Sequence, residues 1–317
     1  MKKSISIIAL CLILAAPVGC NKEEETTTTP SLSGLSISCE NTTSKSVPTY
    51  IAVGDELTFT ADVSKLYVSD GSEELGTVGL YWQVGSDYKD TLTRNIKVQN
   101  PPLTFRFDAT GKYAIVCYAY SDKGYYNASA STNTRVIDPE TSLTGLSGER
   151  AAGSAYRTVS LNGLLWQAEN LYEENTGASY EDSPVVDSVL GRYYTWTQAQ
   201  TACPEGWRLP TAAEWDALGE EAGRLMANAF FLEERMWPIN IQFEINNETG
   251  FNAIPAGYRD NTAGYYAQAG YGEYALFWTA DEDGDKAEYR YIYGKNPQIQ
   301  KGKGDKNTLA LSVRCVK

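Results

Sequence analysis

The chain has 317 residues, 42% hydrophobic and 21% charged, which is enough apolar material for a folded core and too little charge for a disordered chain. Histidine is absent, which excludes Ser-His-Asp and Cys-His nucleophile systems and histidine-ligated zinc. The net charge of −13 disfavours nucleic acid and anionic lipid as partners, because an acidic surface offers them no counter-charge.

The first 19 residues are organised like an export signal. Lys2 and Lys3 form a basic start, and an apolar run of about a dozen residues follows, from Ile5 to Ala16. At about 1.5 Å per residue, this run is too short to cross a hydrocarbon core of about 30 Å as a helix. It therefore predicts a secretory signal over residues 1–19 and not a membrane-spanning anchor.

The residues before Cys20 resemble the lipobox of bacterial lipoproteins. Small residues precede the cysteine in Pro17-Val18-Gly19-Cys20, with proline where the family pattern prefers leucine. The resemblance implies that Cys20 becomes an acylated N-terminus, and several acyl chains on one cysteine give stable anchoring. The alternative is an ordinary signal with an incidental cysteine.

Residues 20–34 are interpreted as a polar tether. An acidic run at 21–25 precedes threonines at 26–29. The Lys-Glu-Glu cluster directly after the cysteine resembles the export signal of surface-exposed lipoproteins in Bacteroidetes-type bacteria. This resemblance implies an outer-membrane lipoprotein that faces the cell exterior, and a merely solubilising spacer is the alternative.

Residues 35–138 have the pattern of an all-β sandwich. Apolar and aromatic residues alternate with polar ones in four runs, at 35–39, 57–63, 103–107 and 113–118. Trp82 has the character of a buried tryptophan on a central strand. The residues around 53–59, Trp82 and 107–113 resemble a PKD or immunoglobulin-like module. Such modules usually space a functional domain from its anchor.

Four cysteines remain once Cys11 leaves with the signal and Cys20 is taken by lipid. They are Cys39, Cys117, Cys203 and Cys315. An even remainder in an exported chain predicts disulfides, with three possible connectivities. One connectivity joins Cys39 to Cys117, although immunoglobulin bridges link the second and sixth strands and Cys39 lies on the first predicted strand.

Residues 139–148 have the composition of a linker, and residues 149–317 form the second predicted domain. Two capping boxes, Thr197 with Gln200 and Thr211 with Glu214, each predict the start of a helix. We expect Arg208 and Glu214 to pair near the second start. An apolar stripe predicts that the second helix continues along Trp215, Leu218, Ala222, Leu225 and Met226.

Six phrases follow one another in this second domain. They are W-x-A-E-N-L, Y-x-W, C-P-x-G-W-R-L-P-T-x-x-E-W, G-F-N-A-x-P-A-G, F-W and S-V-R-C-V. With these phrases, residues 155–317 resemble the Fibrobacter succinogenes major paralogous domain. The resemblance implies a C-type-lectin-like α+β fold on an exported or surface protein, without an agreed activity. It also implies one bridge between an early helix and the last strand, which maps onto Cys203 and Cys315.

Most other conspicuous residues have a structural interpretation, and we predict neither a metal nor a cofactor. A calcium loop that began at Asp281 would need Glu at its twelfth position, which is Ile292, so residues 281–285 are interpreted as a solvated acidic turn. Four lysines are interpreted as a hairpin end: Lys295, Lys301, Lys303 and Lys306. Five tryptophans of the phrases are interpreted as core: Trp166, Trp196, Trp207, Trp215 and Trp278.

The sequence does not favour an enzyme, because no carboxylate pair stands out and a bridged Cys203 and Cys315 leave no thiol pair for formylglycine-generating chemistry. Two functions remain. One is a surface module that binds glycan or a host or partner protein, and the other is a structural subunit of an envelope or surface appendage.

The candidate binding residues are four tyrosines in the Gly/Tyr segment 264–274: Tyr265, Tyr266, Tyr271 and Tyr274. Tyrosine gives a rigid amphipathic surface at low entropic cost, so binding loops favour it. The alternative is that these rings cap the core of their own domain.

Overall fold

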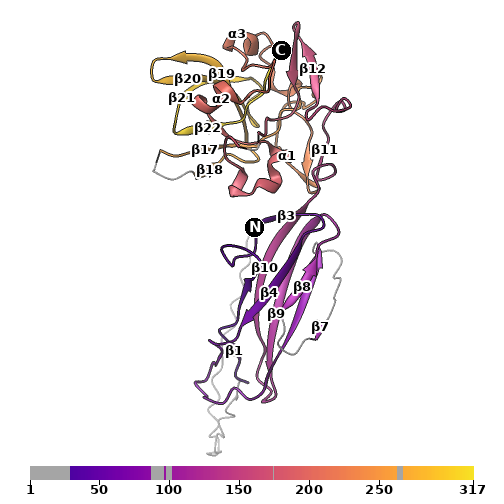
Figure 1. The fold of residues 1–317 in the computed structure, drawn as a ribbon, viewed down its shortest axis with the longest axis vertical. Helices are drawn as coiled ribbons and strands as arrows, with labels where there is room; N and C mark the ends of the chain where they lie inside the picture. Colours follow the sequence, from indigo (N-terminus) through magenta and orange to yellow (C-terminus); the bar gives the residue numbers. More distant parts are fainter. Residues whose placement is uncertain (1–28, 87–95, 98–101, 174, 263–266) are drawn as a thin grey trace, which may run out of the picture.

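The structure is a computed structural model that describes residues 29–86, 96–97, 102–173, 175–262 and 267–317. The described chain is mostly β, with 43% of residues in strands and 9% in helices, so sheets set its architecture. An elongated N-terminal part and a rounder C-terminal part follow one another (Figure 1). No helix within the described ranges is long and apolar enough to cross a membrane.

Two sheets form most of the N-terminal part, with strand orders β3-β10-β9-β6-β7 and β2-β4-β8. Strand β3 runs parallel to β10, and the other pairs are antiparallel. The short strands β1 and β5 pair separately. The bounds are β1 Leu32–Ser33, β2 Ser36–Cys39, β3 Tyr50–Ala52, β4 Glu56–Asp62, β5 Tyr67–Val68, β6 Val78–Ser86, β7 Ile96–Lys97, β8 Leu103–Arg106, β9 Gly111–Ser121 and β10 Ala128–Ile137.

The two sheets share one hydrophobic core. Phe59 on β4 and Trp82 on β6 are both essentially unexposed, and their ring centroids lie 6.3 Å apart. The alternating runs are therefore confirmed as strands that bury one face, and Trp82 is confirmed as a core residue of a central strand.

The Cys39–Cys117 bridge is not formed, so that connectivity is corrected: both cysteines are free and buried. Cys39 ends β2, an edge strand that pairs with β4, and its Sγ donates to Oδ1 of Asn41 at 3.3 Å. Burial raises the pKa of the Cys117 thiol to about 12. Both residues therefore behave as small apolar side chains of the core.

The C-terminal part contains four small sheets, with orders β11-β15-β16, β12-β13, β14-β22-β17-β18 and β19-β20-β21. Its strands are β11 Leu143–Thr144, β12 Thr158–Leu161, β13 Leu164–Gln167, β14 Tyr194–Thr195, β15 Phe230–Phe231, β16 Glu234–Arg235, β17 Tyr258–Asp260, β18 Ala267–Ala269, β19 Tyr274–Asp283, β20 Lys286–Tyr293, β21 Gln300–Asp305 and β22 Leu309–Leu311. Its helices are α1 Asp187–Leu190, α2 Trp196–Ala202 and α3 Ala212–Asp216, with single turns η1 Tyr180–Asp182, η2 Pro184–Val186 and η3 Ala222–Arg224.

The predicted helix starts are half right. Helix α3 begins at the predicted box of Thr211 and Glu214. Helix α2 begins two residues earlier than predicted, with Thr195 and not Thr197 as its N-cap and Gln198 as the reciprocal partner. Thr195 is held extended because it pairs with Ala310 of β22, and this places the helix start there.

The long second helix is wrong. Helix α3 ends at Asp216, and Gly219 has a φ of 96°, a backbone conformation that a continuing α-helix does not contain. The stripe residues are nevertheless core, because all five are buried in one cluster: Trp215, Leu218, Ala222, Leu225 and Met226. Their apolar pattern therefore indicates buried side chains, but the backbone that carries them is irregular after Asp216 and not one helix.

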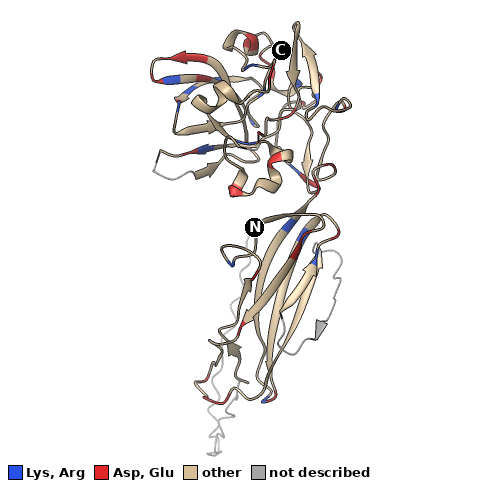
Figure 2. Cartoon of the chain, in the orientation of Figure 1, with Lys and Arg blue, Asp and Glu red and all other residues tan. Residues whose placement is uncertain are grey.

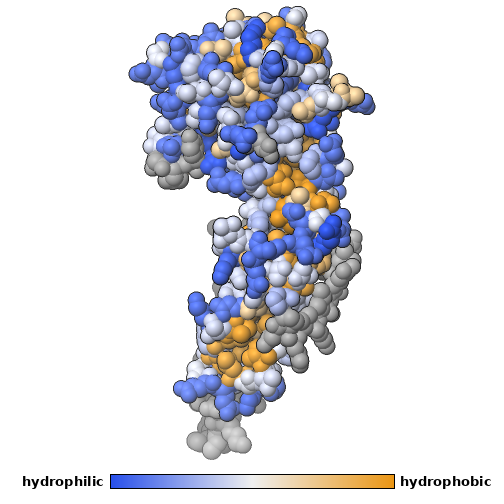
Figure 3. All heavy atoms as spheres, in the orientation of Figure 1, coloured by the Kyte–Doolittle hydropathy of each residue, from blue (hydrophilic) through white to orange (hydrophobic). Residues whose placement is uncertain are grey.

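The two parts meet in a packed junction. Tyr50 and Ile137 of the N-terminal part are buried in the same cluster as residues of the C-terminal part. The Tyr50 ring lies 6.1 Å from the Tyr180 ring and 6.3 Å from the Phe231 ring, centroid to centroid. Lys112 and Glu234 form an ion pair across the junction. Hydrophobic residues gather at this waist (Figure 3).

Part of the segment with linker composition is built into the C-terminal part. Leu143 and Thr144 form β11, which pairs with β15. The Ser147 amide donates to Oδ1 of Asn252 at 2.7 Å, and Nδ2 of Asn252 donates to the Ser147 carbonyl at 2.9 Å. These contacts tie the segment to the scaffold directly after the junction.

Candidate functional site

A buried arginine joins three of the six phrases. Arg314 is 0% exposed, and its Nε donates to Oδ1 of Asn170 at 2.8 Å. Its two terminal nitrogens donate to the carbonyls of Phe251 and Asn252, both at 2.8 Å, and one of them also donates to the Gln167 carbonyl at 3.2 Å. The phrases around Gln167, Phe251 and Arg314 therefore meet at one point inside the scaffold.

Among the residues that the structure describes, no carboxylate forms an ion pair with this arginine. Its guanidinium lies 4.8 Å from the ring centroid of Phe251 and 5.5 Å from that of Phe277, close enough for cation–π attraction. Burial lowers the pKa of Arg314, since desolvation penalises the charged form. Carbonyl oxygens and ring faces hold the charge, so this group is structural and faces no ligand.

The predicted Cys203–Cys315 bridge is confirmed. The two Cα atoms lie 5.8 Å apart, and the bridge closes a sequence separation of 112 residues. Cys203 is the C-cap of α2, and Cys315 directly follows Arg314 near the chain end. The disulfide and Arg314 together fix the last residues against the start of the domain.

The tryptophans divide into two groups. Trp166, Trp215 and Trp278 are at most 2% exposed, which confirms them as core. Trp196 and Trp207 are only half-buried. Lysine ammonium groups cover both: Lys306 lies 4.9 Å from the Trp196 ring and Lys317 lies 4.7 Å from the Trp207 ring.

The expected pair of Arg208 and Glu214 is confirmed as a bidentate ion pair, with N···O distances of 2.8 and 2.6 Å. The Arg208 hydrogen bond is the main reason that the pKa of Glu214 is lowered to about 2. The Ala212 amide at the start of α3 donates to Oδ2 of Asp281 at 2.6 Å. One residue of the acidic run thus satisfies a helix end.

The acidic turn and the lysine-rich strand pair with each other. Asp283 binds Lys303 at 2.7 Å, Glu282 pairs with Lys306, and Lys301 binds Asp216 at 2.7 Å. Figure 2 shows the opposite charges side by side on the β19–β20–β21 sheet. No group of three or more carboxylate or cysteine side chains in the described ranges is arranged to hold a metal ion. This region is an exposed, ion-paired hairpin end.

The tyrosines of the Gly/Tyr segment have different surroundings. Tyr265 and Tyr266 lie outside the described residues. Tyr271 is 36% exposed, and its ring packs at 5.0 Å on the Tyr180 ring next to the junction. Tyr274 is half-buried at the start of β19 and stacks on Tyr293 of β20, with a centroid distance of 4.7 Å and an interplanar angle of 13°.

Tyr274 belongs to a larger group that we call the tyrosine face: Tyr258, Tyr274, Tyr289, Tyr291 and Tyr293. All five residues are half-buried. Tyr291 lies 6.4 Å from Tyr274 and 5.9 Å from Tyr289, centroid to centroid. A Cβ on Gly270 would lie within 3.4 Å of both the Tyr258 and Tyr274 rings, so the absence of a side chain there makes room for both.

The sequence analysis missed four of these five tyrosines. A usable signal was present in Glu288-Tyr289-Arg290-Tyr291-Ile292-Tyr293, where an aromatic residue recurs at every second position. That alternation predicts a strand with three tyrosines on one side. The neighbour relation to Tyr274 depends on the register of β19 with β20, which pairs Tyr274 with Tyr293.

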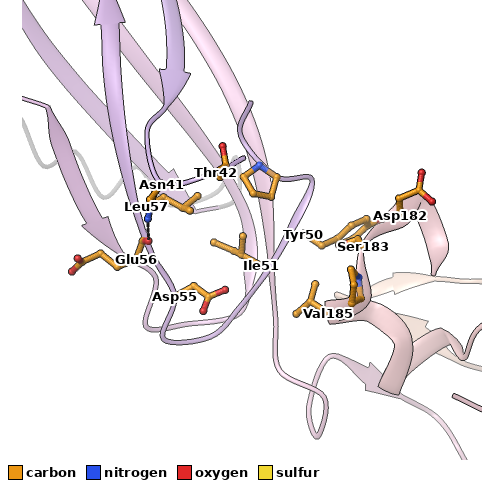
Figure 4. A pocket seen from close by; sticks show the side chains of 12 residues that line it. Asn41, Thr42, Tyr50, Ile51, Asp55, Glu56, Leu57, Asp182, Ser183 and Val185 are labelled. Carbon is orange, nitrogen blue, oxygen red and sulfur yellow. Dashed lines mark hydrogen bonds between the residues drawn. The ribbon is translucent and has the colours of Figure 1, made fainter. Parts of the chain in front are cut away.

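A hollow of about 450 Å³ lies beside the junction, between Tyr50, Ile51 and Leu57 on one side and Ser183 and Val185 on the other (Figure 4). Three of its polar side chains already have partners. Asp182 accepts from Arg259 at 2.7 Å, Asp55 accepts from the Ala52 amide at 2.9 Å, and Asn41 donates to the Glu56 carbonyl at 2.7 Å. These contacts support the junction and leave the hollow without a defined ligand chemistry.

The described chain is thus a mostly β protein whose C-terminal part closes around a buried arginine and a disulfide, with half-exposed tyrosines on one sheet face. Residues 154–317 match the Fibrobacter succinogenes major domain, slightly more than half of the chain. The chain belongs to this family, as the six phrases indicate.

No curated protein matches the chain. Among solved structures, the Yersinia pseudotuberculosis adhesin InvE is similar at 11% sequence identity and a TM-score of 0.25, over 90% of this chain and 70% of that one. Similarity at this level carries no argument about function.

Proposed function

We propose that this protein is a non-catalytic binding or adhesion module for a glycan or a host or partner protein, displayed on the outer surface of a bacterial outer membrane. One observation carries the proposal. The described chain enters at β1, at the end of the N-terminal part that is remote from the C-terminal part (Figure 1). A chain anchored before residue 29 would therefore hold its C-terminal part away from the membrane.

The dimensions and the junction support this arrangement. Strand β10 has 10 residues and reaches about 33 Å at about 3.3 Å per residue. It runs from the β1 end to the junction, where Ile137 is buried against the C-terminal part. A PKD or immunoglobulin-like stalk that carries a C-type-lectin-like domain would have this form.

The chemistry of the C-terminal part favours binding over catalysis. Its cysteines are bridged, Arg314 is enclosed, and Glu214, Asp216 and Asp283 hold ion pairs. These groups stabilise the scaffold. The half-exposed tyrosines are the side chains best suited to contact a partner.

Anchoring can be tested at Cys20. We expect mass spectrometry of the native protein to show acyl chains on Cys20 at a new N-terminus, and Cys20→Ala to release protein from the membrane fraction. An N-terminus upstream of Cys20 in the mature protein would contradict lipid anchoring.

Binding can be tested with the chain from residue 21 onward, which retains every described residue. We expect it to bind a reproducible subset of a combined glycan and protein array while remaining monomeric in light scattering. Heat-unfolded protein is the control for nonspecific adsorption. A silent array together with growth into regular polymers would instead indicate a structural subunit of an appendage.

A further inference from the structure

We infer that the tyrosine face is a binding site for a neutral oligosaccharide. This inference rests on the proposed binding function and names the site and the chemical class of ligand. Three properties of the face carry it: the arrangement of the rings, the state of their hydroxyl groups, and the distribution of charge between the two sides of the sheet.

The rings form a continuous row across two strands. The register pairs Tyr274 with Tyr293, Leu276 with Tyr291 and Trp278 with Tyr289, so these six side chains share one side of the sheet. Successive tyrosine rings are 4.7 to 6.4 Å apart. Such a row can contact several consecutive sugar units, which favours an oligosaccharide over a single sugar.

The site is held in place before any ligand arrives. The Tyr289 side chain lies against Gly302 of β21, where a Cβ would come within 2.5 Å of two ring atoms and the hydroxyl oxygen. Trp278, next to Tyr289 on the same side of the sheet, is 0% exposed, and its Nε1 donates to the Tyr194 carbonyl at 2.8 Å. A rigid row of rings loses little conformational entropy when it binds, which favours affinity.

The hydroxyl groups of the face are free for a ligand. Within the described ranges, none of its five tyrosine hydroxyls makes a hydrogen bond to the protein, whereas the hydroxyl of the buried Tyr193 donates to the Ala256 carbonyl at 2.6 Å. Burial raises the pKa values of Tyr274 and Tyr289, so both stay protonated donors. Sugars offer apolar C–H faces for rings and hydroxyls for these donors and acceptors.

Most charged side chains of the sheet lie on the side opposite the tyrosines. The tyrosine side of β20 carries Ala287 and the three tyrosines, and the same side of β21 carries Gln300, Gly302 and Gly304. The alternate positions carry the charges, and these make ion pairs, such as Arg290 with Asp216 at 2.7 Å. On β19 the tyrosine side ends in Glu282, opposite Ala287, and Lys306 neutralises this carboxylate. A face with no charged side chain on β20 and β21 and a neutralised one on β19 matches a neutral ligand, and the net charge of −13 disfavours acidic polysaccharides.

The test is calorimetric titration of the chain from residue 21 onward with neutral hexasaccharides of glucose and of mannose, and with an oligogalacturonate as the acidic counterpart. Tyr274→Ala/Tyr293→Ala removes the stacked pair. Tyr274→Phe/Tyr293→Phe keeps both rings and removes only their hydroxyls. Tyr126→Ala is the control, because Tyr126 is 65% exposed on the N-terminal part.

We expect the wild type to bind at least one neutral hexasaccharide more tightly than the acidic one. The alanine pair should lose at least 10-fold in affinity, the phenylalanine pair should lose less, and Tyr126→Ala should bind as the wild type does. If the double alanine variant does not fold, the double phenylalanine variant still tests the inference. The inference then requires the phenylalanine variant to bind more weakly than the wild type.

Several results would overturn the inference. If both the double alanine and the double phenylalanine variant bind saccharide as the wild type does, the tyrosine face is not the binding site. The proposed binding function would then still stand. Preference for the acidic saccharide would refute the neutral class. A different result is that the wild type binds no saccharide but binds a protein on the array that the Tyr274 and Tyr293 variants do not bind. This result would show that the face is a protein-docking surface. A protein inactive on every array and titration would refute the proposed function itself.

Discussion

Replacing Arg314 with methionine is expected to lower the free energy of unfolding of the C-terminal part by about 3–5 kcal/mol, because several buried acceptors lose their hydrogen-bond donor. Methionine fills part of the volume but donates nothing to the Asn170 side chain or to the carbonyls of Phe251 and Asn252. Each buried acceptor left without a donor costs about 1–3 kcal/mol. Arg314→Lys should lie between wild type and methionine, since lysine keeps the charge but lacks the planar fork.

Urea unfolding followed by tryptophan fluorescence measures this effect, because every tryptophan except Trp82 lies in the C-terminal part. Arg235→Met is the matched control. Arg235 is an exposed arginine on β16 of the same part, and its replacement should change stability by no more than about 0.5 kcal/mol. Arg314→Met within about 1 kcal/mol of wild type would mean that rearrangement or water satisfies these acceptors.

The strands of the N-terminal part were predictable because their signal is local. In residues 57–63, apolar and polar side chains alternate, which predicts the face of the strand on which each side chain lies. As expected, β4 buries Leu57 and Phe59. The capping boxes show where local signals become ambiguous. Thr195 with Gln198 and Thr197 with Gln200 both fit the pattern, and the choice is made by β22, more than a hundred residues away.

The functional residues of the C-terminal part were harder to predict, because they depend on contacts between segments far apart in the sequence. Arg314 could be identified as a motif residue, but its partners come from segments about 60 and 140 residues away, and their convergence is a property of the whole fold. The tyrosine face likewise depends on strand register, so the sequence analysis found Tyr274 and missed its partners on β20. In contrast, the Cys203–Cys315 pairing followed from the family resemblance, since the phrases fix both cysteines in one scaffold.

Loss of that disulfide is expected to cost up to about 5 kcal/mol, because a cross-link over 112 residues removes much of the chain entropy of the unfolded state. Cys203→Ser is the better variant for measuring it. Cys203 is half-buried at the end of α2, whereas Cys315 is 0% exposed in the core, where substitution would add a packing defect. The melting temperature of Cys203→Ser should fall to that of the reduced wild type, and reductant should not lower it further.

A count of reactive thiols shows whether the loss of stability comes from the Cys203–Cys315 bridge alone. The chain from residue 21 onward should show two reactive thiols when unfolded without reductant, from Cys39 and Cys117, and four after reduction. Both free thiols are buried in the N-terminal core, so neither should react while that core is folded. A count of zero before reduction would mean that Cys39 and Cys117 are bridged. Reductant would then break two bridges at once, and only the difference between Cys203→Ser and wild type, both oxidised, would measure the Cys203–Cys315 bridge.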